Sequence, residues 1–275
     1  MNDLLEEGLA TAERQITAKT GITGVATGFP ELDRMLLGLH NRELTVLVGH
    51  PSTGKTAFML NILKHIAVEA NNGVLLFSPA MSKQEVMRRF LCFLGGVDLP
   101  GLRSGQLDGQ QNHIPLCIAA SKVFKANIYV DDTPAISTLE LTKRALIYHA
   151  KWYISLVIID SLDCIAPNGR PGDRYMEWLK ILRCLKLFAQ DNRVPVLALT
   201  SLSRFPKHQR WLAWRAIEQT ADVILKMQRV QEHRLQGHRV RVSVVQQRNG
   251  PTGSIVLGFK KAVQQFTDDA VGNIP

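Results

Sequence analysis

Several marks of exported, membrane-embedded and metal-binding proteins are missing from this sequence of 275 residues. No uninterrupted apolar run approaches the roughly 18 residues that a transmembrane helix needs. The acidic N-terminus lacks the hydrophobic core of a secretion signal. The four cysteines form no C-x-x-C pair and have no histidine cluster nearby, so we expect a cytoplasmic protein without a membrane partner. They should be buried free thiols in a reducing compartment: Cys92, Cys117, Cys164 and Cys184.

The sequence also has no visible internal repeat. Its hydrophobic fraction of 45% is ample for one large α/β domain, in preference to two small ones. We place this domain at residues 21–266, between an N-terminal helical segment at 1–20 and a loose tail at 267–275.

Acidic residues are in deficit, with 24 Asp and Glu against 33 Lys and Arg and a formal charge of +9. The excess is concentrated between Arg204 and Arg248, where ten basic residues stand against three acidic ones. Such a distribution favours a polyanionic partner. A solvated basic face is the simpler alternative.

The central motif lies at residues 49–56, which match the phosphate-binding pattern G-x-x-x-x-G-K-[ST]. An apolar run at 44–48 precedes it, and a segment with helical periodicity at 55–70 follows it. Glycines let successive backbone N–H groups converge on phosphate oxygens, and a helix N-terminus favours an anion. We therefore predict a site for ATP or another nucleoside triphosphate. Its residues are Gly49, Ser52, Thr53, Gly54, Lys55 and Thr56.

Three side chains have specific roles in this prediction. Lys55 should reach the β- and γ-phosphates, and the Thr56 hydroxyl should complete the shell of a Mg²⁺ ion. Asp160 follows the apolar run 156–159, which is the setting of an acid that holds Mg²⁺ through water. Capping a helix is the alternative role for this aspartate.

Hydrolysis needs a further group, usually a carboxylate or a glutamine, that polarises the attacking water. Parallel strands deliver their C-terminal ends to one edge of a sheet, so this group belongs just after the strand expected at 74–78. The sequence there is Ser78-Pro79-Ala80-Met81, and Glu85, a turn along the next helix, is more simply a surface residue. The sequence thus predicts nucleotide binding without rapid turnover. Four strand ends should meet at this edge: Gly49, Pro79-Ala80, Asp160 and Thr200-Ser201.

Strand and helix patterns alternate along most of the chain, which predicts an α/β fold with a mostly parallel sheet flanked by helices on both faces. The expected strands are 44–48, 74–78, 127–130, 155–160 and 194–200. The expected helices are 30–37, 55–70, 82–94, 112–124, 138–151 and 174–191. Beyond residue 221 the pattern becomes β-rich, which predicts a C-terminal antiparallel β extension. Its strands are 222–228, 239–246 and 253–259, with a turn at 250–253.

A short amphipathic helix is expected at 3–16, with Asp3 as its cap and Leu5, Leu9 and Ile16 on one face. An isolated helix of this length is marginal in water, so its apolar stripe must dock on something. The partner is either its own domain or a neighbouring subunit.

Residues 21–29 resemble the segment ahead of the phosphate loop in the DnaB-type replicative helicases, which are RecA-like ring ATPases. The resemblance covers roughly residues 20 to 266, and the turn at 248–251 separates this family from other RecA-like ATPases. Further motifs sit in the family's order and at similar spacing: Arg103-Ser104-Gly105-Gln106-Leu107, Ile128-Tyr129-Val130-Asp131-Asp132, Ile158-Ile159-Asp160-Ser161-Leu162, Ile217-Glu218-Gln219-Thr220-Ala221-Asp222 and Gln247-Arg248-Asn249-Gly250-Pro251-Thr252-Gly253.

The resemblance implies a RecA-like fold and a homo-oligomeric, hexameric ring, with ATP and Mg²⁺ between subunits and single-stranded DNA in the central channel. It implies that Arg248 is an arginine finger, which stabilises charge on the phosphoryl group in the neighbour's site. The segment at 3–16 would be the linker helix that docks on the adjacent protomer. A bacterial or phage replication setting fits.

Basic residues lie where the resemblance places a channel loop, interleaved with two tryptophans that either stack on bases or pack at a subunit contact. These candidates for DNA binding are Arg204, Lys207, Arg210 and Arg215, and the tryptophans are Trp211 and Trp214.

The departures from the family pattern concern hydrolysis and DNA grip. Ala80 stands in place of the catalytic glutamate, Ser201 in place of the sensor glutamine, and Gln246 in place of a lysine before the finger. The DNA-gripping loop is altered and shortened, and reads Leu212-Ala213-Trp214-Arg215-Ala216. These changes suggest that motor function has been relaxed.

Three hypotheses follow from the sequence. The first is an ATP-dependent helicase or translocase in DNA replication, with weakened hydrolysis. The second is a non-motor nucleotide-binding ring or adaptor, such as a helicase loader or accessory, that binds DNA, a replicative helicase or another replication protein. The third is a different RecA-like ATPase, of the recombination or clock type, which the turn at 248–251 disfavours.

Overall fold

The computed structural model describes residues 21–105, 109–166, 174–205, 207–230 and 238–268. The helix expected at 3–16 and the tail residues 269–275 lie outside these ranges. Within the described ranges, no helix is both long and apolar enough to cross a membrane.

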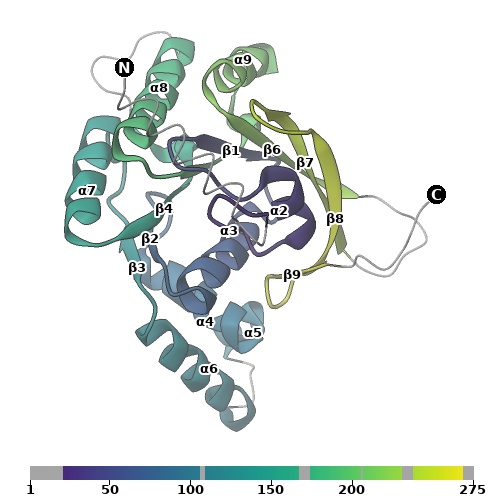
Figure 1. Cartoon of the computed structure of the whole chain (residues 1–275). Coiled ribbons are helices and arrows are strands. Elements are labelled where there is room, and N and C mark those ends of the chain that lie inside the picture. Colours follow the sequence, from purple (N-terminus) through teal and green to yellow (C-terminus); the bar gives the residue numbers. More distant parts are fainter. Residues whose placement is uncertain (1–20, 106–108, 167–173, 206, 231–237, 269–275) are drawn as a thin grey trace.

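One nine-stranded sheet organises the molecule, in the order β3-β2-β4-β5-β1-β6-β7-β8-β9 (Figure 1). The strands from β3 to β6 in this order pair in parallel, and β7, β8 and β9 add on in antiparallel fashion. The bounds are β1 (Leu44–Gly49), β2 (Gly73–Phe77), β3 (Ile128–Asp131), β4 (Ile154–Asp160), β5 (Val196–Thr200), β6 (Val223–Val230), β7 (His238–Gln247), β8 (Gly253–Lys260) and β9 (Gln265–Thr267).

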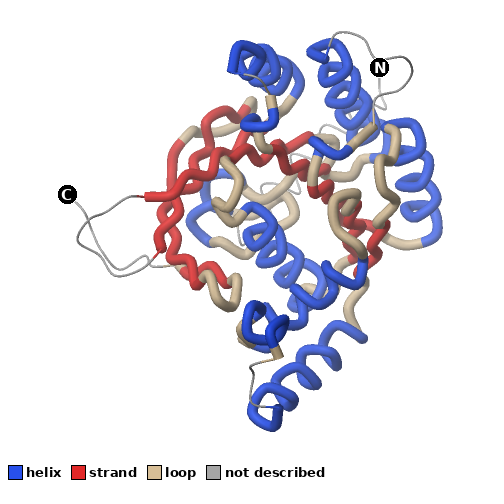
Figure 2. The backbone as a smooth tube through the Cα atoms, turned by 180° about the vertical axis from the view of Figure 1, so that it is seen from behind, coloured by secondary structure: helices blue, strands red, loops and turns tan. Residues whose placement is uncertain are grey.

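Helices cover both faces of this sheet, as seen from opposite sides in Figures 1 and 2. Their bounds are α2 (Pro30–Leu36), α3 (Lys55–Leu63), α4 (Lys83–Gly95), α5 (Leu99–Ser104), α6 (Gly109–Phe124), α7 (Thr138–Lys151), α8 (Arg174–Asn192) and α9 (Arg210–Thr220). The last turns of the helix expected at 55–70 are a π-helix, Lys64–Glu69.

Successive residues of the parallel strands point to opposite faces, which produces two apolar cores. In β4, Leu156 and Ile158 pack in the core beneath α2, α3 and α4, whereas Val157 and Ile159 pack in the core beneath α7, α8 and α9. The strand is thus buried on both sides, as expected for a parallel sheet. The predicted α/β class is confirmed.

The predicted antiparallel extension is also confirmed, but two details of it are wrong. The strand β6 belongs to the parallel part, because it pairs in parallel with β1, and the extension begins only at β7. The cause is α9, a helix in a segment where a loop was expected. A strand-helix-strand connection on one face returns the second strand parallel to the first.

The boundary of the expected tail is also wrong. Thr267, the first residue of the supposed loose tail, is the last residue of β9, which pairs with β8.

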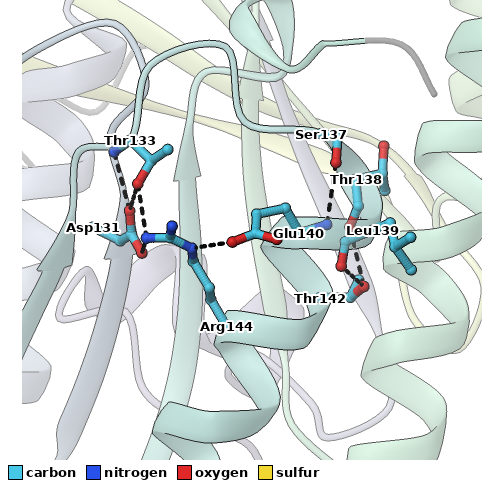
Figure 3. Close-up of polar contacts among 8 residues, drawn as sticks. All are labelled: Asp131, Thr133, Ser137, Thr138, Leu139, Glu140, Thr142 and Arg144. Carbon is cyan, nitrogen blue, oxygen red and sulfur yellow. Dashed lines mark hydrogen bonds and ion pairs between the residues drawn. The ribbon is translucent and has the colours of Figure 1, made fainter. Parts of the chain in front are cut away.

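The connection from the edge strand β3 to α7 is held by a polar cluster (Figure 3). The buried carboxylate of Asp131 accepts bonds from the Thr133 hydroxyl at 2.7 Å and from Arg144 Nη1 at 3.1 Å. Ser137 caps α7, since its Oγ accepts from the Glu140 N–H at 3.2 Å. The Glu140 carboxylate does not complete a capping box but binds Arg144 Nε at 2.7 Å.

The cysteine prediction holds only in part. All four thiols are free, but only Cys92 is buried, while Cys117 is exposed on α6. The other two are partly exposed. The exposed face of an amphipathic helix can accommodate a cysteine, so residue type alone was a poor guide to burial.

Candidate functional site

The predicted phosphate loop connects the C-terminal end of β1 to the first residue of α3. Gly54 precedes the helix with a left-handed φ of +95°, a conformation that glycine adopts at no steric cost. A Cβ on Gly49 would lie 2.9 Å from Thr53 Oγ1 and 3.2 Å from the Met227 carbonyl oxygen. Both glycines of the motif are therefore required by the local geometry.

The side chain of Lys55 lies over this loop. Its Nζ donates to the carbonyl oxygens of Gly49 at 2.8 Å and of His50 at 3.0 Å. The ammonium group is thereby held beside the backbone N–H groups at the start of α3, which is the position from which a lysine can bind a phosphate. At the loop apex, Arg229 of β6 donates to the Ser52 carbonyl oxygen.

The structure brings Thr56 and Asp160 together, as expected from the convergence of strand ends. Thr56 Oγ1 donates to Asp160 Oδ2 at 2.8 Å. Burial raises the pKa of the Asp160 carboxyl, while the Thr56 bond and the Lys55 charge act in the opposite sense. Two oxygen ligands thus stand side by side next to the phosphate loop, which suits Mg²⁺, an ion that uses few protein ligands and completes its shell with phosphates and water.

A cavity of about 970 Å³ opens beside the loop. Its lining includes loop and α3 residues on one side, α5 on another, and the ends of β8 and the β8–β9 turn. The described lining residues are Ser52, Gly54, Lys55, Thr56, Ala57, Arg89, Asp98, Leu99, Pro100, Arg103, Ser104, Phe259, Lys261, Ala262 and Gln264. A volume of this size and a positive lining fit a magnesium-bound nucleoside triphosphate.

The end of β2 is where a water-polarising group would stand. The residues that follow this strand are Ser78-Pro79-Ala80-Met81, and none of them has a carboxylate. Ser78 is buried, its Oγ donating to the Met81 carbonyl oxygen at 2.9 Å, and Ala80 is exposed. Glu85 is less exposed than a surface residue should be, with 19% of its side chain accessible. It binds Arg88 and Arg89, so the prediction of a plain surface role is wrong.

A carboxylate that no motif marked, that of Asp163 in the turn after β4, lies against the end of β5. Asp163 accepts bonds from Thr200 Oγ1 at 2.9 Å and from the Ser201 N–H at 3.1 Å. The hydroxyl of Ser201 bonds instead to that of Ser203 at 2.8 Å. No local pattern marks the contact of Asp163 with β5, because Thr200 and Ser201 lie 37 and 38 residues further along the chain.

Arg248 lies just beyond β7, next to Asp222 and the start of β1, whereas the phosphate loop follows the other end of β1. Its guanidinium binds the Gln219 carbonyl oxygen at 3.3 Å and pairs with Asp222 at 3.6 Å. About half of the side chain, 48%, is exposed. Gln246 donates to the carbonyl oxygen of Glu218 at 3.0 Å.

The segment expected to be a channel loop is mostly helix, since α9 spans Arg210–Thr220. Trp211 and Arg215 are both exposed, so both are accessible to a partner. The Arg215 Cζ lies over the Trp211 ring, 5.6 Å from the ring centre. Trp214 packs against the core beneath α8 and α9 and donates to Glu218.

The basic candidates in this segment differ in accessibility. Lys207 is exposed, whereas Arg210 is directed inward and donates to the Phe205 carbonyl oxygen at 3.2 Å. The side chain of Arg204 is outside the described part of the structure.

Comparison with known proteins agrees with this geometry. The sequence matches the family model of the DnaB-like helicase C terminal domain over residues 24–268. It is 34% identical over 259 residues to replicative DNA helicase DnaB of Geobacillus stearothermophilus, covering 90% of this chain and 57% of the relative. It is 32% identical over 280 residues to replicative DNA helicase DnaC of Bacillus subtilis (strain 168), covering 98% and 62%. The chain therefore spans about three fifths of the length of these helicases.

Two solved structures share the fold. One, described as an ATPase domain, superposes with a TM-score of 0.87 at 27% identity, covering 96% of this chain and 98% of that one. The other, described as "The Structure Of A DnaB-Like Replicative Helicase And Its Interactions With Primase", gives 0.83 at 27% identity, with 95% and 66% covered. The RecA-like sheet, the phosphate loop and these matches together establish that the chain belongs to the DnaB-like helicase C-terminal domain family.

Proposed function

We propose that this protein is an ATP-binding, helicase-type ring subunit that acts on single-stranded DNA in replication and hydrolyses ATP slowly. The single observation that supports this best is the combination of an intact Lys55 and Thr56–Asp160 arrangement with an alanine at position 80. Lys55 and the Thr56–Asp160 pair suit phosphate and metal binding, whereas the alanine at position 80 cannot activate water. The setting would be the cytoplasm of a bacterium or of a phage-infected cell.

The nucleotide would be held by the chain's own groups in the cavity beside the loop. Backbone N–H groups of residues 52–56 would surround the β-phosphate, and Lys55 would turn from its carbonyl partners toward the β- and γ-phosphates. Thr56 and Asp160 would hold Mg²⁺, directly and through water. Bound Mg²⁺ would supply the positive charge that neutralises the terminal phosphates.

Slow hydrolysis follows from the groups at the strand ends. Ala80 has no proton acceptor, and the Ser201 side chain is short and bonded to Ser203, so neither can orient a water molecule as a carboxylate and a glutamine would. Asp163 is occupied by three donors, from Thr200, Ser201 and Ser161.

The ring would complete each site with Arg248 of the adjacent subunit. This residue lies at the opposite end of the strands from its own phosphate loop, because its N–H bonds to Asp222, which adjoins Leu44 at the start of β1, and it is half exposed, as a group that acts on a neighbour must be. The exposed cations Lys207 and Arg215, with Trp211, would contact DNA phosphates and bases, together with Arg204.

The second candidate function is a non-motor ring or adaptor that binds DNA, a replicative helicase or another replication protein and uses ATP for assembly. Two observations favour it: position 80 lacks a carboxylate, and α9 occupies the place of the expected DNA-gripping loop. A true motor needs both hydrolysis and a moving DNA contact.

Steady-state ATP hydrolysis with and without single-stranded DNA separates the two candidates. Loss of a water-positioning group commonly slows hydrolysis by about 10²–10⁴-fold. A slow rate that DNA still stimulates supports the helicase-type function. A background rate, unchanged by DNA, with measurable ATP affinity supports the non-motor ring, and DNA-stimulated turnover at several per second would refute the weakened site.

A further inference from the structure

The residue Arg248 is held by Asp222 through both its backbone and its side chain. The Arg248 N–H donates to the Asp222 carbonyl oxygen at 3.1 Å, and Arg248 Nε pairs with Asp222 Oδ1 at 3.6 Å. One terminal nitrogen, Nη2, donates to the Gln219 carbonyl oxygen at 3.3 Å. A guanidinium has five N–H groups, so these contacts leave others for a group outside the chain, on a side chain that is 48% exposed.

The carboxylate of Asp222 is itself fixed by two other elements. Its Oδ2 accepts from the Leu44 N–H at 2.8 Å, at the start of β1, and from Lys186 Nζ of α8 at 2.6 Å. The same ammonium donates to the Arg42 carbonyl oxygen at 2.8 Å. One carboxylate oxygen of Asp222 therefore binds the sheet and a helix, and the other faces Arg248.

Burial makes this arrangement strong. Only 7% of the Asp222 side chain and 15% of the Lys186 side chain are exposed, so water and salt screen their attraction little. A buried carboxylate needs a compensating charge, and Lys186 supplies it. The carboxylate that holds Arg248 thus stands on regular elements of the fold, which position a functional group more precisely than a loop does.

We propose that Asp222 is a positioning residue, which orients Arg248 toward the nucleotide of the adjacent subunit, and that Lys186 fixes Asp222 in turn. The inference rests on the proposed function, because it takes Arg248 as the group that acts on the neighbour. Ordering a long side chain at an interface costs conformational entropy, and an anchor that is present before assembly lowers this cost. The phosphate loop of the same chain is unaffected, since it follows the other end of β1.

The test measures assembly of the full chain with Mg²⁺ and a non-hydrolysable ATP analogue, by analytical ultracentrifugation at several protein concentrations. Asp222→Asn keeps an acceptor for the Leu44 N–H but removes the charge, and should raise the concentration of half-assembly by about two- to fivefold. Arg248→Ala should raise it further. Adding Asp222→Asn to Arg248→Ala should then change nothing more, because Asp222 acts through Arg248. The matched control is Glu43→Gln, which should assemble like the wild type, because Glu43 contacts Asn249 in the same turn.

The double variant is the decisive readout, because a merely structural role of Asp222 would add a further loss. Such a loss, or assembly that Asp222→Asn leaves unchanged or strengthens, would overturn the inference while the proposed function stands. If the wild-type chain does not bind the analogue or does not assemble with it, or if Arg248→Ala assembles like the wild type, the proposed function fails and the inference with it. If Asp222→Asn does not fold, its combination with Lys186→Gln replaces it, because the two changes remove both buried charges together.

Discussion

At the scale of single residues, binding depends on a few atoms at the start of α3. Lys55 Nζ already lies within hydrogen-bond distance of two loop carbonyls, and Thr56 is already bonded to Asp160. The Thr56–Asp160 pair is held in place before the ligand arrives, so only Lys55 has to exchange its carbonyl partners for phosphate oxygens.

Replacing Lys55 with alanine should reduce ATP affinity to background, on the order of 100-fold or more, because the only long cation of the loop itself is lost. Titration with a fluorescent ATP analogue measures this. The matched control is Lys64→Ala on the following π-helix, where the lysine pairs with Glu69 and should not matter. Unchanged affinity in Lys55→Ala would mean that the phosphate loop is elsewhere.

Introducing a carboxylate at position 80 should restore hydrolysis. We expect Ala80→Glu to raise the steady-state ATPase rate, by as much as about 10²–10⁴-fold if the rest of the crevice is competent. Ala80→Gln is the control of equal size without the charge. If Ala80→Glu gains nothing while Ala80→Glu combined with Ser201→Gln does, the sensor position is also limiting. If neither gains, the missing carboxylate is not what limits turnover.

The sequence predicted the residues of the phosphate loop well because their function follows from local spacing. Gly49, Lys55 and Thr56 act through the backbone that directly surrounds them. Asp163 escaped prediction because its bonds from Thr200 and Ser201 form only when distant segments fold together. Glu85 was expected to be a plain surface residue, but its side chain is only 19% exposed and pairs with Arg88 and Arg89.

At the scale of elements, the contact between β3 and α7 is the clearest case of a buried charge that holds two segments together (Figure 3). Burial alone would raise the pKa of Asp131, but the bonds from Thr133 and Arg144 outweigh it and hold the pKa below its usual value. A carboxyl whose pKa is lower in the folded state stabilises the fold above its unfolded pKa, and this stabilisation is lost as the pH falls through the folded pKa.

Asp131→Asn should therefore lower the free energy of unfolding by about 1–3 kcal/mol at pH 7, the cost of weakening a buried charged hydrogen-bond acceptor. The difference from wild type should shrink below about pH 4, where the wild-type carboxyl itself takes up a proton. Urea unfolding at several pH values measures both effects. Glu140→Gln, which changes the exposed partner of the same Arg144, should cost at most about 0.5–1 kcal/mol. A difference that is independent of pH would contradict the role of the charge.

Most of the described elements were predicted from the sequence, but two helices were not. The strands β1, β2, β4 and β5 were found within two residues, because each is a compact apolar run. The helices α5 and α9 were missed: the first has six residues and includes proline and glycine, and the second was taken for a loop on the strength of a family resemblance. Burial of one face of α9 against α8 and the sheet, rather than local propensity, stabilises that helix.

At the scale of the whole molecule, a ring would place each Arg248 at a neighbour's phosphate loop. The parallel sheet was predictable from alternation, yet the position of β6 beside β1 was not, because it follows from the missed crossover helix. That placement matters for assembly, since β6 and its partner β7 connect the nucleotide side of the sheet to the Arg248 turn.

Arg248→Ala should lower ATP hydrolysis by about tenfold or more, and only in the assembled ring. Because Arg248 would act on the adjacent site, mixing Arg248→Ala subunits with Lys55→Ala subunits should recover activity that neither variant has alone. Rate measurements on the mixtures test this. Arg241→Ala, an exposed arginine of β7, is the control and should leave the rate unchanged. Failure of the mixtures to recover would place the action of Arg248 within its own chain.

The central claim, tight ATP binding with slow cleavage, is tested most directly by one measurement: the chemical state of radiolabelled ATP bound to excess protein with Mg²⁺ and single-stranded DNA. Protein and label are mixed, bound nucleotide is separated at intervals, and its ATP and ADP contents are determined. We predict that the bound label remains ATP for far longer than the fraction of a second that a typical enzyme turnover takes. Either no bound label at all or its conversion to ADP within about a second would contradict the account.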